Sequence, residues 1–223
     1  MAKPIISTSS LISVEQIYQA KVRLKGIADI TPMLPNYRFS ELYDCNLLLK
    51  REDLQVVRSY KIRGAYNNMA TMTEEQLKNG VVCASAGNHA QGVAFACQKM
   101  QVHGKIFMPV VTPKQKLKKV KLFGKGYVEV VLTGDTYDDA YAEAMLCAKA
   151  EGRGFVHPFD DPGTIAAIAV VVLDVDDVVV VALLQAQAET FDALGNDCRP
   201  ANQRWPCQAL VDHHLYRSQD ALL

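Results

Sequence analysis

A lysine at the expected start of a helix is the residue of this chain best suited to covalent chemistry. Lys61 lies in the run from Ser59 to Ala65, SYKIRGA. The positive end of the helix dipole disfavours a second positive charge there, and partial burial lowers the pKa of an amine from its usual value of about 10.4. A neutral amine can attack a carbonyl carbon and form a Schiff base. The sequence therefore makes Lys61 a candidate nucleophile.

A second group of residues with chemical potential runs from Ala84 to Gly92, ASAGNHAQG. Its small residues let the backbone approach a ligand, and exposed amides at a helix start bind anions such as a carboxylate. Asn88 can donate a hydrogen bond to a phenolic oxygen. Taken alone, the segment also fits an ordinary strand-to-helix turn with Asn88 as the N-cap.

The elements that must position these residues follow a regular alternation. A buried strand is predicted at 81–85 and further strands at 105–110 and 128–132. Helices are predicted at 61–72, 88–100, 113–123 and 136–151. Strands that alternate with helices over short links predict an α/β fold with a parallel, doubly wound sheet. Ligands of such sheets bind at the carboxyl ends of the strands, where the next helices begin. Both Lys61 and the Ser85–Asn88 turn are expected at helix beginnings.

The N-terminal part carries local start signals for helices. Ser13 to Gln16 fits a capping box, which predicts a helix over about 14–26. Thr73 to Gln76 fits a second capping box, and Asn46 to Arg51 reads as a short strand.

Composition excludes several classes of partner. The chain has 223 residues, with 24 Lys and Arg against 24 Asp and Glu, so no basic excess is available for a nucleic acid. The basic run 114–119 reads as the solvent face of a helix.

The six cysteines form no C-x-x-C pair, as expected for free thiols in a reducing compartment. The apolar stretch 165–184 is interrupted by Asp174, Asp176 and Asp177, which argues against a membrane span. No signal peptide is evident, so a cytoplasmic location is expected.

Together the motifs resemble those of a known family. The Ser59–Ala65 run is similar to the cofactor-lysine motif of the threonine dehydratase family, and Ala84–Gly92 is similar to its asparagine loop. The segment His157–Pro162, HPFDDP, is similar to a further family segment. The resemblance covers residues 5 to about 166. It implies pyridoxal-phosphate fold type II, the tryptophan-synthase-beta-like fold.

The resemblance also implies roles for individual residues. Lys61 is expected to hold pyridoxal 5'-phosphate as a Schiff base and then to remove the substrate α-proton. Tyr60 is expected to flank the pyridine ring, and Asn88 to hold the phenolic oxygen of the cofactor. The substrate carboxylate is expected to bind the backbone amides of Ser85, Ala86, Gly87, Asn88 and His89. The implied reaction converts L-threonine to 2-oxobutanoate and ammonia, the first step toward isoleucine, in a homo-oligomer.

Two further positions narrow the alternatives. In related serine racemases a serine is expected where this chain has Ala86, which carries no exchangeable proton, so dehydration is favoured over racemisation. His157, Asp160 and Asp161 are expected to shape a loop between prolines rather than to bind metal. His213-His214 is only a weak metal signal, and no metal site is predicted.

The resemblance weakens in the tail. Family members continue with a tetraglycine phosphate loop, whereas this chain has no two adjacent glycines. Residues 175–181 look like the strand before that loop, but Ala182 to Gln185 follow it. We expect residues 1–53 to form the N-terminal part of a large domain, 54–153 a small α/β domain, and 154–223 a remnant of a truncated large domain with a divergent tail. The sequence leaves two alternatives open: an inactive remnant of a truncated or frame-altered enzyme, and a serine dehydratase-type activity.

Overall fold

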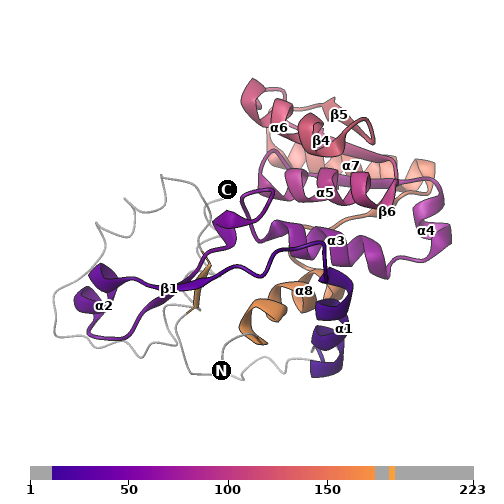
Figure 1. Ribbon diagram of the computed structural model, residues 1–223. Coiled ribbons are helices and arrows are strands. Elements are labelled where there is room, and N and C mark those ends of the chain that lie inside the picture. Colours follow the sequence, from indigo (N-terminus) through magenta and orange to yellow (C-terminus); the bar gives the residue numbers. More distant parts are fainter. Residues whose placement is uncertain (1–11, 174–180, 184–223) are drawn as a thin grey trace, which may run out of the picture.

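Four parallel strands form the main sheet of the computed structural model, which describes residues 12–173 and 181–183 (Figure 1). The strand order is β5-β4-β3-β6. The strands are β3 (Val81–Ala84), β4 (Gly104–Met108), β5 (Val128–Leu132) and β6 (Gly154–Phe155). The three strands predicted from the sequence are confirmed. β3 ends one residue earlier than predicted, and β4 begins one residue earlier and ends two residues earlier.

Helices cover both faces of this sheet because β3 is apolar on both faces. Its four residues are fully buried. Val81 and Cys83 pack in a core with residues of α5 (Asn88–Met100) and α6 (Lys114–Gly124). Val82 and Ala84 point to the other face, where they pack with alanines of α7 (Tyr137–Glu151). Alternate side chains of a strand point to opposite faces. The doubly wound arrangement predicted from the sequence is therefore confirmed.

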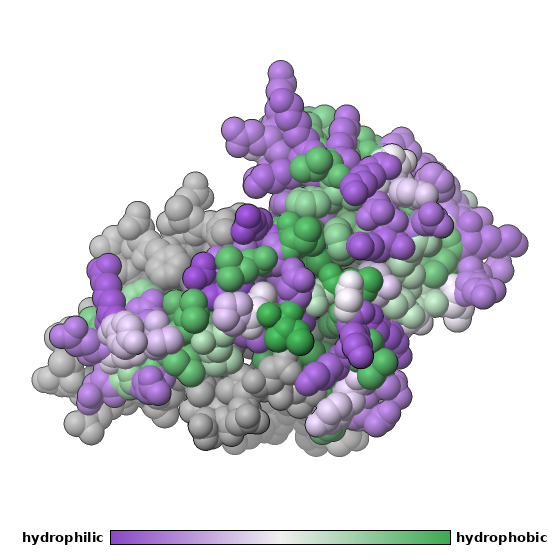
Figure 2. All heavy atoms as spheres, in the orientation of Figure 1, coloured by the Kyte–Doolittle hydropathy of each residue, from purple (hydrophilic) through white to green (hydrophobic). Residues whose placement is uncertain are grey.

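The lysine-rich side of α6 faces solvent, as predicted. Lys114, Lys118 and Lys119 are exposed, whereas Val120 is buried in the core. Hydrophilic side chains accordingly gather over α6 at the top of the molecule in Figure 2. The basic run is the outer side of an amphipathic helix.

A second, three-stranded sheet is formed by segments far apart in the sequence. β1 (Met33–Pro35) runs antiparallel to β2 (Leu48–Lys50), which runs parallel to β7 (Val181–Leu183). The short strand predicted at 46–51 is confirmed over its middle. Of the run 175–181, only the last residue lies within the described part. The strand continues through Leu183. Ala182 and Leu183, which were predicted to follow the strand, therefore belong to it.

The remaining helices lie before, within and between the segments that form the two sheets. They are α1 (Val14–Leu24), α2 (Tyr37–Tyr43), the 3-10 helix η2 (Glu52–Leu54), α3 (Lys61–Thr71), α4 (Glu74–Lys78) and α8 (Pro162–Leu173). α3 packs against α5 and α8, and α1 packs against α8. The predicted capping boxes at Ser13 and Thr73 are both present. None of the described helices has the length and apolar character needed to cross a membrane.

Candidate active site

Lys61 is the first residue of α3, as the sequence predicted. Its amide donates a hydrogen bond to Ser59 Oγ at 3.2 Å, and its amine Nζ donates one to the backbone oxygen of Pro158 at 3.0 Å. Burial lowers the pKa of this amine to about 8. The direction agrees with the sequence prediction. Of the two causes proposed there, burial is the one that the structure supports.

Two aromatic rings flank the amine of Lys61. Nζ lies 5.1 Å from the centre of the Tyr60 ring and 6.0 Å from that of Phe159. An ammonium at these distances is attracted to the ring faces. The rings and the Pro158 carbonyl therefore hold the amine in one place, and the apolar rings also contribute to its burial.

The Ser85–Asn88 turn joins β3 to α5, and two backbone amides of the turn donate hydrogen bonds that stabilise it. The Ser85 amide donates a hydrogen bond to Phe107 O of β4 at 3.0 Å, and the Gly87 amide donates one to Ser85 Oγ at 3.1 Å. The N-cap of α5 is Gly87, which makes no side-chain capping bond. The alternative in which Asn88 caps the helix is therefore wrong, because Asn88 is already the first helical residue. Its partly buried side chain makes no hydrogen bond to another described residue.

His89 ties this turn to the segment that contacts Lys61. The ring is buried, and its Nε2 lies 2.9 Å from the carbonyl oxygen of Val156. Because a carbonyl only accepts, Nε2 carries the proton, and Nδ1 is left without a partner among the described residues. Burial, and then the charge of Lys61, lower the pKa of His89 to about 3. His89 is therefore a neutral side chain that links α5 to Val156, the residue after β6.

The backbones of α3 and α5 approach each other closely at Lys61. A Cβ atom on Gly92 would lie 2.9 Å from Lys61 O and 3.1 Å from Lys61 C. Only glycine permits such an approach. On the other side of α3, a Cβ on Gly64 would lie 2.8 Å from Thr164 Cγ2 of α8. The two glycines thus allow α5 and α8 to pack directly against α3, the helix that carries Lys61.

The histidine and aspartates before α8 shape a loop, as predicted. The Asp160 amide donates a hydrogen bond to His157 Nδ1 at 2.8 Å, and Asp161 Oδ1 accepts one from the Thr164 amide at 2.8 Å. Within the described ranges no group of three possible metal ligands comes together. His213 and His214 lie outside the described residues.

Sequence reasoning missed several residues that surround Lys61. The Pro158 carbonyl and the Phe159 ring belong to the segment His157–Pro162, for which no contact with Lys61 was predicted. Every residue has a backbone carbonyl, so the sequence does not indicate which one accepts a hydrogen bond. Gly92 was recognised as small, but its contact with Lys61 required the packing of two helices. The charged residues Glu52 and Arg63 pair across two elements, and no local spacing indicates that contact.

Comparisons with known proteins identify the family of the chain. Residues 25–194 match the family described as pyridoxal-phosphate dependent enzyme. The chain is similar to the biosynthetic L-threonine dehydratase of Bacillus subtilis, with 57% identity over 164 residues, which are 74% of this chain and 39% of that protein. The corresponding Staphylococcus aureus protein is 47% identical over 161 residues, 72% of this chain and 38% of that protein. The chain thus spans about two fifths of the length of these relatives.

Solved structures show the same fold. Threonine deaminase isoform 2 of Solanum lycopersicum has a TM-score of 0.65 and 34% identity, covering 79% of this chain and 52% of that chain. Maize serine racemase has a TM-score of 0.67 and 25% identity, covering 73% of this chain and 50% of that chain. The resemblance and the fold type predicted from the motifs are confirmed. This chain belongs to the family of pyridoxal-phosphate dependent enzymes.

Proposed function

We propose that this chain is the part of a threonine dehydratase that carries the reactive lysine, and that the enzyme converts L-threonine to 2-oxobutanoate and ammonia. One observation carries the proposal. Lys61 begins α3 with its amine buried between two rings, at a pKa of about 8, in a chain 57% identical to a biosynthetic threonine dehydratase. An amine of that pKa is largely neutral at slightly alkaline pH, which nucleophilic attack on an aldehyde requires.

The residues around Lys61 fit the ring and aldehyde end of pyridoxal 5'-phosphate. Lys61 offers the amine, Tyr60 lies beside it, and Asn88 has a side-chain amide with no hydrogen bond to another described residue. A Cβ on Gly87 would meet only Ser85 Oγ, at 4.0 Å, so there is space in front of the turn. When bound, the cofactor supplies an electron sink for the carbon that loses its proton. We assign ring binding to Tyr60 and Asn88.

The turn also suits a substrate carboxylate. Gly87 caps α5 without a side chain, and the first amides of a helix have no partner within the helix. Such amides and the positive end of the helix dipole favour an anion. We assign carboxylate binding to the turn from Ser85 to His89. The amides of Ser85 and Gly87 already donate to Phe107 O and Ser85 Oγ, so the amides of Ala86, Asn88 and His89 are the ones offered to the anion. Lys61 Nζ is the base that takes the substrate α-proton, and the Pro158 carbonyl accepts a hydrogen bond from the amine.

The choice of reaction rests on Ala86. Maize serine racemase shares the fold at 25% identity, so the fold alone does not separate dehydration from racemisation. Ala86 has no hydroxyl that could deliver a proton to the opposite face of the substrate. We therefore favour threonine dehydration toward isoleucine, with serine as the alternative substrate, in a cytoplasmic homo-oligomer.

The residues expected to bind the phosphate of the cofactor favour a second candidate function. β7 ends at Leu183, and the residues that follow in the sequence are Leu184 and Gln185, with no glycine pair anywhere in the chain. Losing two hydrogen bonds to a charged phosphate costs about 3–6 kcal/mol, or roughly 10²–10⁴ in affinity. A protein that keeps the site but binds the cofactor weakly is therefore the competing proposal. The division into residues 1–53, 54–153 and 154–223 remains part of the proposal. The two separate sheets favour two units, but β6, which belongs to the third range, pairs with β3 in the sheet of the second range.

The experiment titrates the full chain with pyridoxal 5'-phosphate and then reduces it with borohydride. Peptide mass spectrometry locates the reduced pyridoxyl group. We expect it on Lys61, and we expect no label at that site in Lys61→Ala. Lys99→Ala is the matched control, because Lys99 is exposed on α5 and should not affect labelling of Lys61. The dependence on cofactor concentration measures affinity.

An assay of 2-oxobutanoate from threonine and of pyruvate from serine follows. Product from threonine that is lost in Lys61→Ala supports the proposal. Labelling of Lys61 without either product supports the binding-only candidate. Absence of label on Lys61 at saturating cofactor contradicts both.

A further inference from the structure

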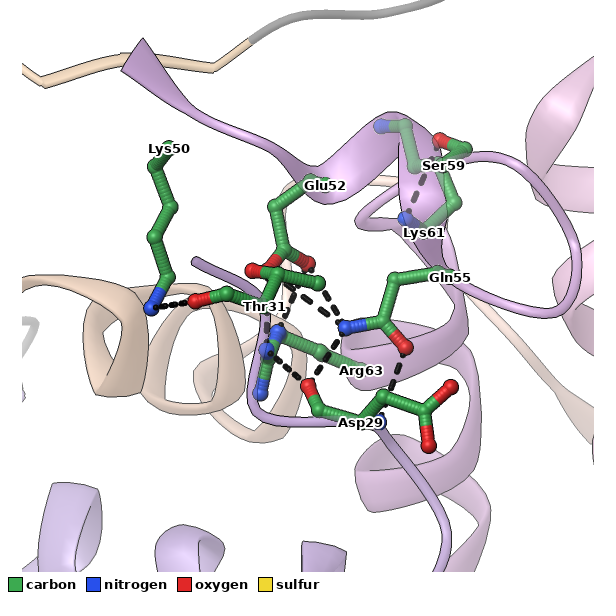
Figure 3. A network of polar contacts seen from close by, with 8 residues as sticks. All are labelled: Asp29, Thr31, Lys50, Glu52, Gln55, Ser59, Lys61 and Arg63. Atoms are coloured by element: carbon green, nitrogen blue, oxygen red, sulfur yellow. Dashed lines mark hydrogen bonds and ion pairs between the residues drawn. The ribbon is translucent and has the colours of Figure 1, made fainter. Parts of the chain in front are cut away.

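A buried ion pair lies two residues beyond Lys61. Arg63 Nε and Nη2 donate hydrogen bonds to Glu52 Oε2 and Oε1, each at 2.8 Å. Glu52 is 0% exposed and Arg63 is 4% exposed. This two-pronged geometry is the strongest that a carboxylate and an arginine can form. Figure 3 shows the pair at the start of α3, with Lys61 on the same turn beside Ser59.

Further hydrogen bonds fix the pair to the chain before it. Thr31 Oγ1 donates to Glu52 Oε1 at 2.6 Å, and Arg63 Nη2 donates to Asp29 O at 3.0 Å. Gln55 Nε2 also donates to Asp29 O, at 2.8 Å, and lies 3.3 Å from Glu52 Oε2 (Figure 3). The network therefore joins the loop after α1, the 3-10 helix η2 and the first turn of α3.

The start of α3 has modest local support. Its N-cap is Tyr60, which makes no side-chain capping hydrogen bond, but the Lys61 amide donates to Ser59 Oγ and the Arg63 amide donates to Tyr60 O at 3.0 Å. By contrast, α1, α4 and α7 all begin with complete capping boxes, in which two side chains bind backbone amides. A helix end with fewer such contacts frays more readily. Arg63 lies in the first turn of α3, so its contacts restrain the same residues that a capping box would restrain.

We propose that the Glu52–Arg63 pair is a positioning device for Lys61, which adds to the local hydrogen bond from Lys61 to Ser59 and keeps the lysine in its buried site. The proposal rests on the proposed function, in which Lys61 is the reactive amine. Glu52 and Arg63 are positioning residues, since neither touches the amine in the contacts described above.

The titration of Lys61 reports its position. Its amine is out of water in the intact structure, and a loosened first turn would return it to water and raise its pKa toward about 10.4. The charged and titratable groups around it are Tyr60 next to it in the chain, His89 on α5, and His157, Asp160 and Asp161 before α8, with the Glu52–Arg63 pair two residues along the helix. A test must therefore loosen the turn without changing any of these charges.

Arg63→Lys meets that condition, because it keeps the positive charge and removes the fork that holds both carboxylate oxygens. Arg51→Lys is the matched control. Arg51 makes the same two-pronged contact with Asp53, at 2.8 and 2.7 Å, but on the partly exposed side of the same segment. The rate at which trinitrobenzenesulfonate modifies Lys61 in the full chain is measured against pH by peptide mass spectrometry, and thermal unfolding is recorded in parallel.

We expect a midpoint near pH 8 for the unaltered chain and for Arg51→Lys, and a higher midpoint for Arg63→Lys. A rise of one pH unit would lower the neutral fraction at pH 8 roughly fivefold. A midpoint that stays near pH 8 in a folded Arg63→Lys protein overturns the proposal, even if the protein melts earlier. An equal rise in Arg51→Lys overturns it as well.

If Arg63→Lys does not fold, Thr31→Val decides the question by the same criteria, because it removes only the hydroxyl that donates to Glu52. The measurement uses neither cofactor nor threonine. A shifted midpoint in a chain that makes no product would uphold the positioning role while the proposed activity fails, so the two outcomes remain distinct.

Discussion

The helices that carry the candidate site begin differently from most of the helices around them. α1, α4 and α7 start with the capping boxes of Ser13, Thr73 and Thr136. α3 and α5, which begin with Lys61 and Asn88, have no capping hydrogen bond from the N-cap side chain, a feature that α6 shares away from the site. At the site, contacts with distant parts of the chain add to the local bond from Lys61 to Ser59: Arg63 binds Glu52, and His89 binds Val156 O.

The difference has a physical cause. A capping side chain binds the first amides of a helix and places a polar group in front of them. At α5 that position is expected to receive a substrate carboxylate, and Gly87 leaves it open. At α3 the first residue must keep its amine buried, and the ion pair of Arg63 with Glu52 restrains the turn from the side. The comparison predicts that tertiary contacts matter more at the site helices than caps matter elsewhere.

The largest expected effect comes from breaking the buried pair. Arg63→Met leaves the carboxylate of Glu52 buried without its charged partner, and we expect the free energy of unfolding to fall by about 3–5 kcal/mol. Urea unfolding measures the loss. The double variant Glu52→Gln/Arg63→Met removes both charges and should be more stable than Arg63→Met alone. A double variant that is less stable than Arg63→Met would contradict this account.

A smaller loss is expected from filling the space between α3 and α5. Alanine is the better helix former by about 1 kcal/mol, but in Gly92→Ala its Cβ would meet the backbone oxygen of Lys61 at 2.9 Å. Overpacking typically costs about 1–3 kcal/mol, so we expect a net loss of up to about 2 kcal/mol. The same urea experiment measures it, with Gly87→Ala as the control, because a Cβ there lies 4.0 Å from its nearest contact, Ser85 Oγ. Equal stability of Gly92→Ala and the unaltered chain would show that the helices can move apart.

Removing a cap away from the site should cost about 1 kcal/mol. Thr136 Oγ1 accepts a hydrogen bond from the Asp139 amide at 3.2 Å and closes the capping box of α7. Thr136→Ala loses this bond, while Thr136→Ser keeps the hydroxyl and should keep most of the stability. The midpoint of Lys61 modification should stay near pH 8 in both variants. A shift of that midpoint would remove the distinction between the two kinds of helix start.

The subtlest effect is a change in the pH dependence of stability. Burial alone raises the pKa of Glu52, but the hydrogen bonds and charge of Arg63, with help from Thr31 and Gln55, lower it overall. A lowered pKa in the folded state stabilises the protein above the pKa of the unfolded state, about 4.3, and that stability is lost as pH falls through the folded pKa. Urea midpoints between pH 7 and pH 3 should therefore fall less in Glu52→Gln than in the unaltered chain. Parallel curves for the two proteins would contradict the assignment.

Much of the fold could be read from local pattern. The apolar runs at 81–85 and 128–132 and the capping boxes at Ser13 and Thr73 located strands and helix starts to within a few residues, because each depends on neighbours in the sequence. The helix predicted at 88–100 is confirmed, and only the alternative that made Asn88 its N-cap is wrong. Asn88 is a favourable capping residue, but the turn of Ser85 and Gly87 begins the helix one residue earlier than the N-cap reading required.

The sequence by itself determined the alternation of strands and helices, the order of the motifs, and the place of Lys61 at the start of a helix, which makes it a candidate reactive lysine. Tertiary structure decided what surrounds that lysine: the Pro158 carbonyl on its amine, Gly92 against its backbone, and the Glu52–Arg63 pair beside its turn. Caps and periodicity act between residues a few positions apart, so they are visible in the chain. Burial and a buried ion pair join segments far apart in the sequence, and only the folded chain brings them together.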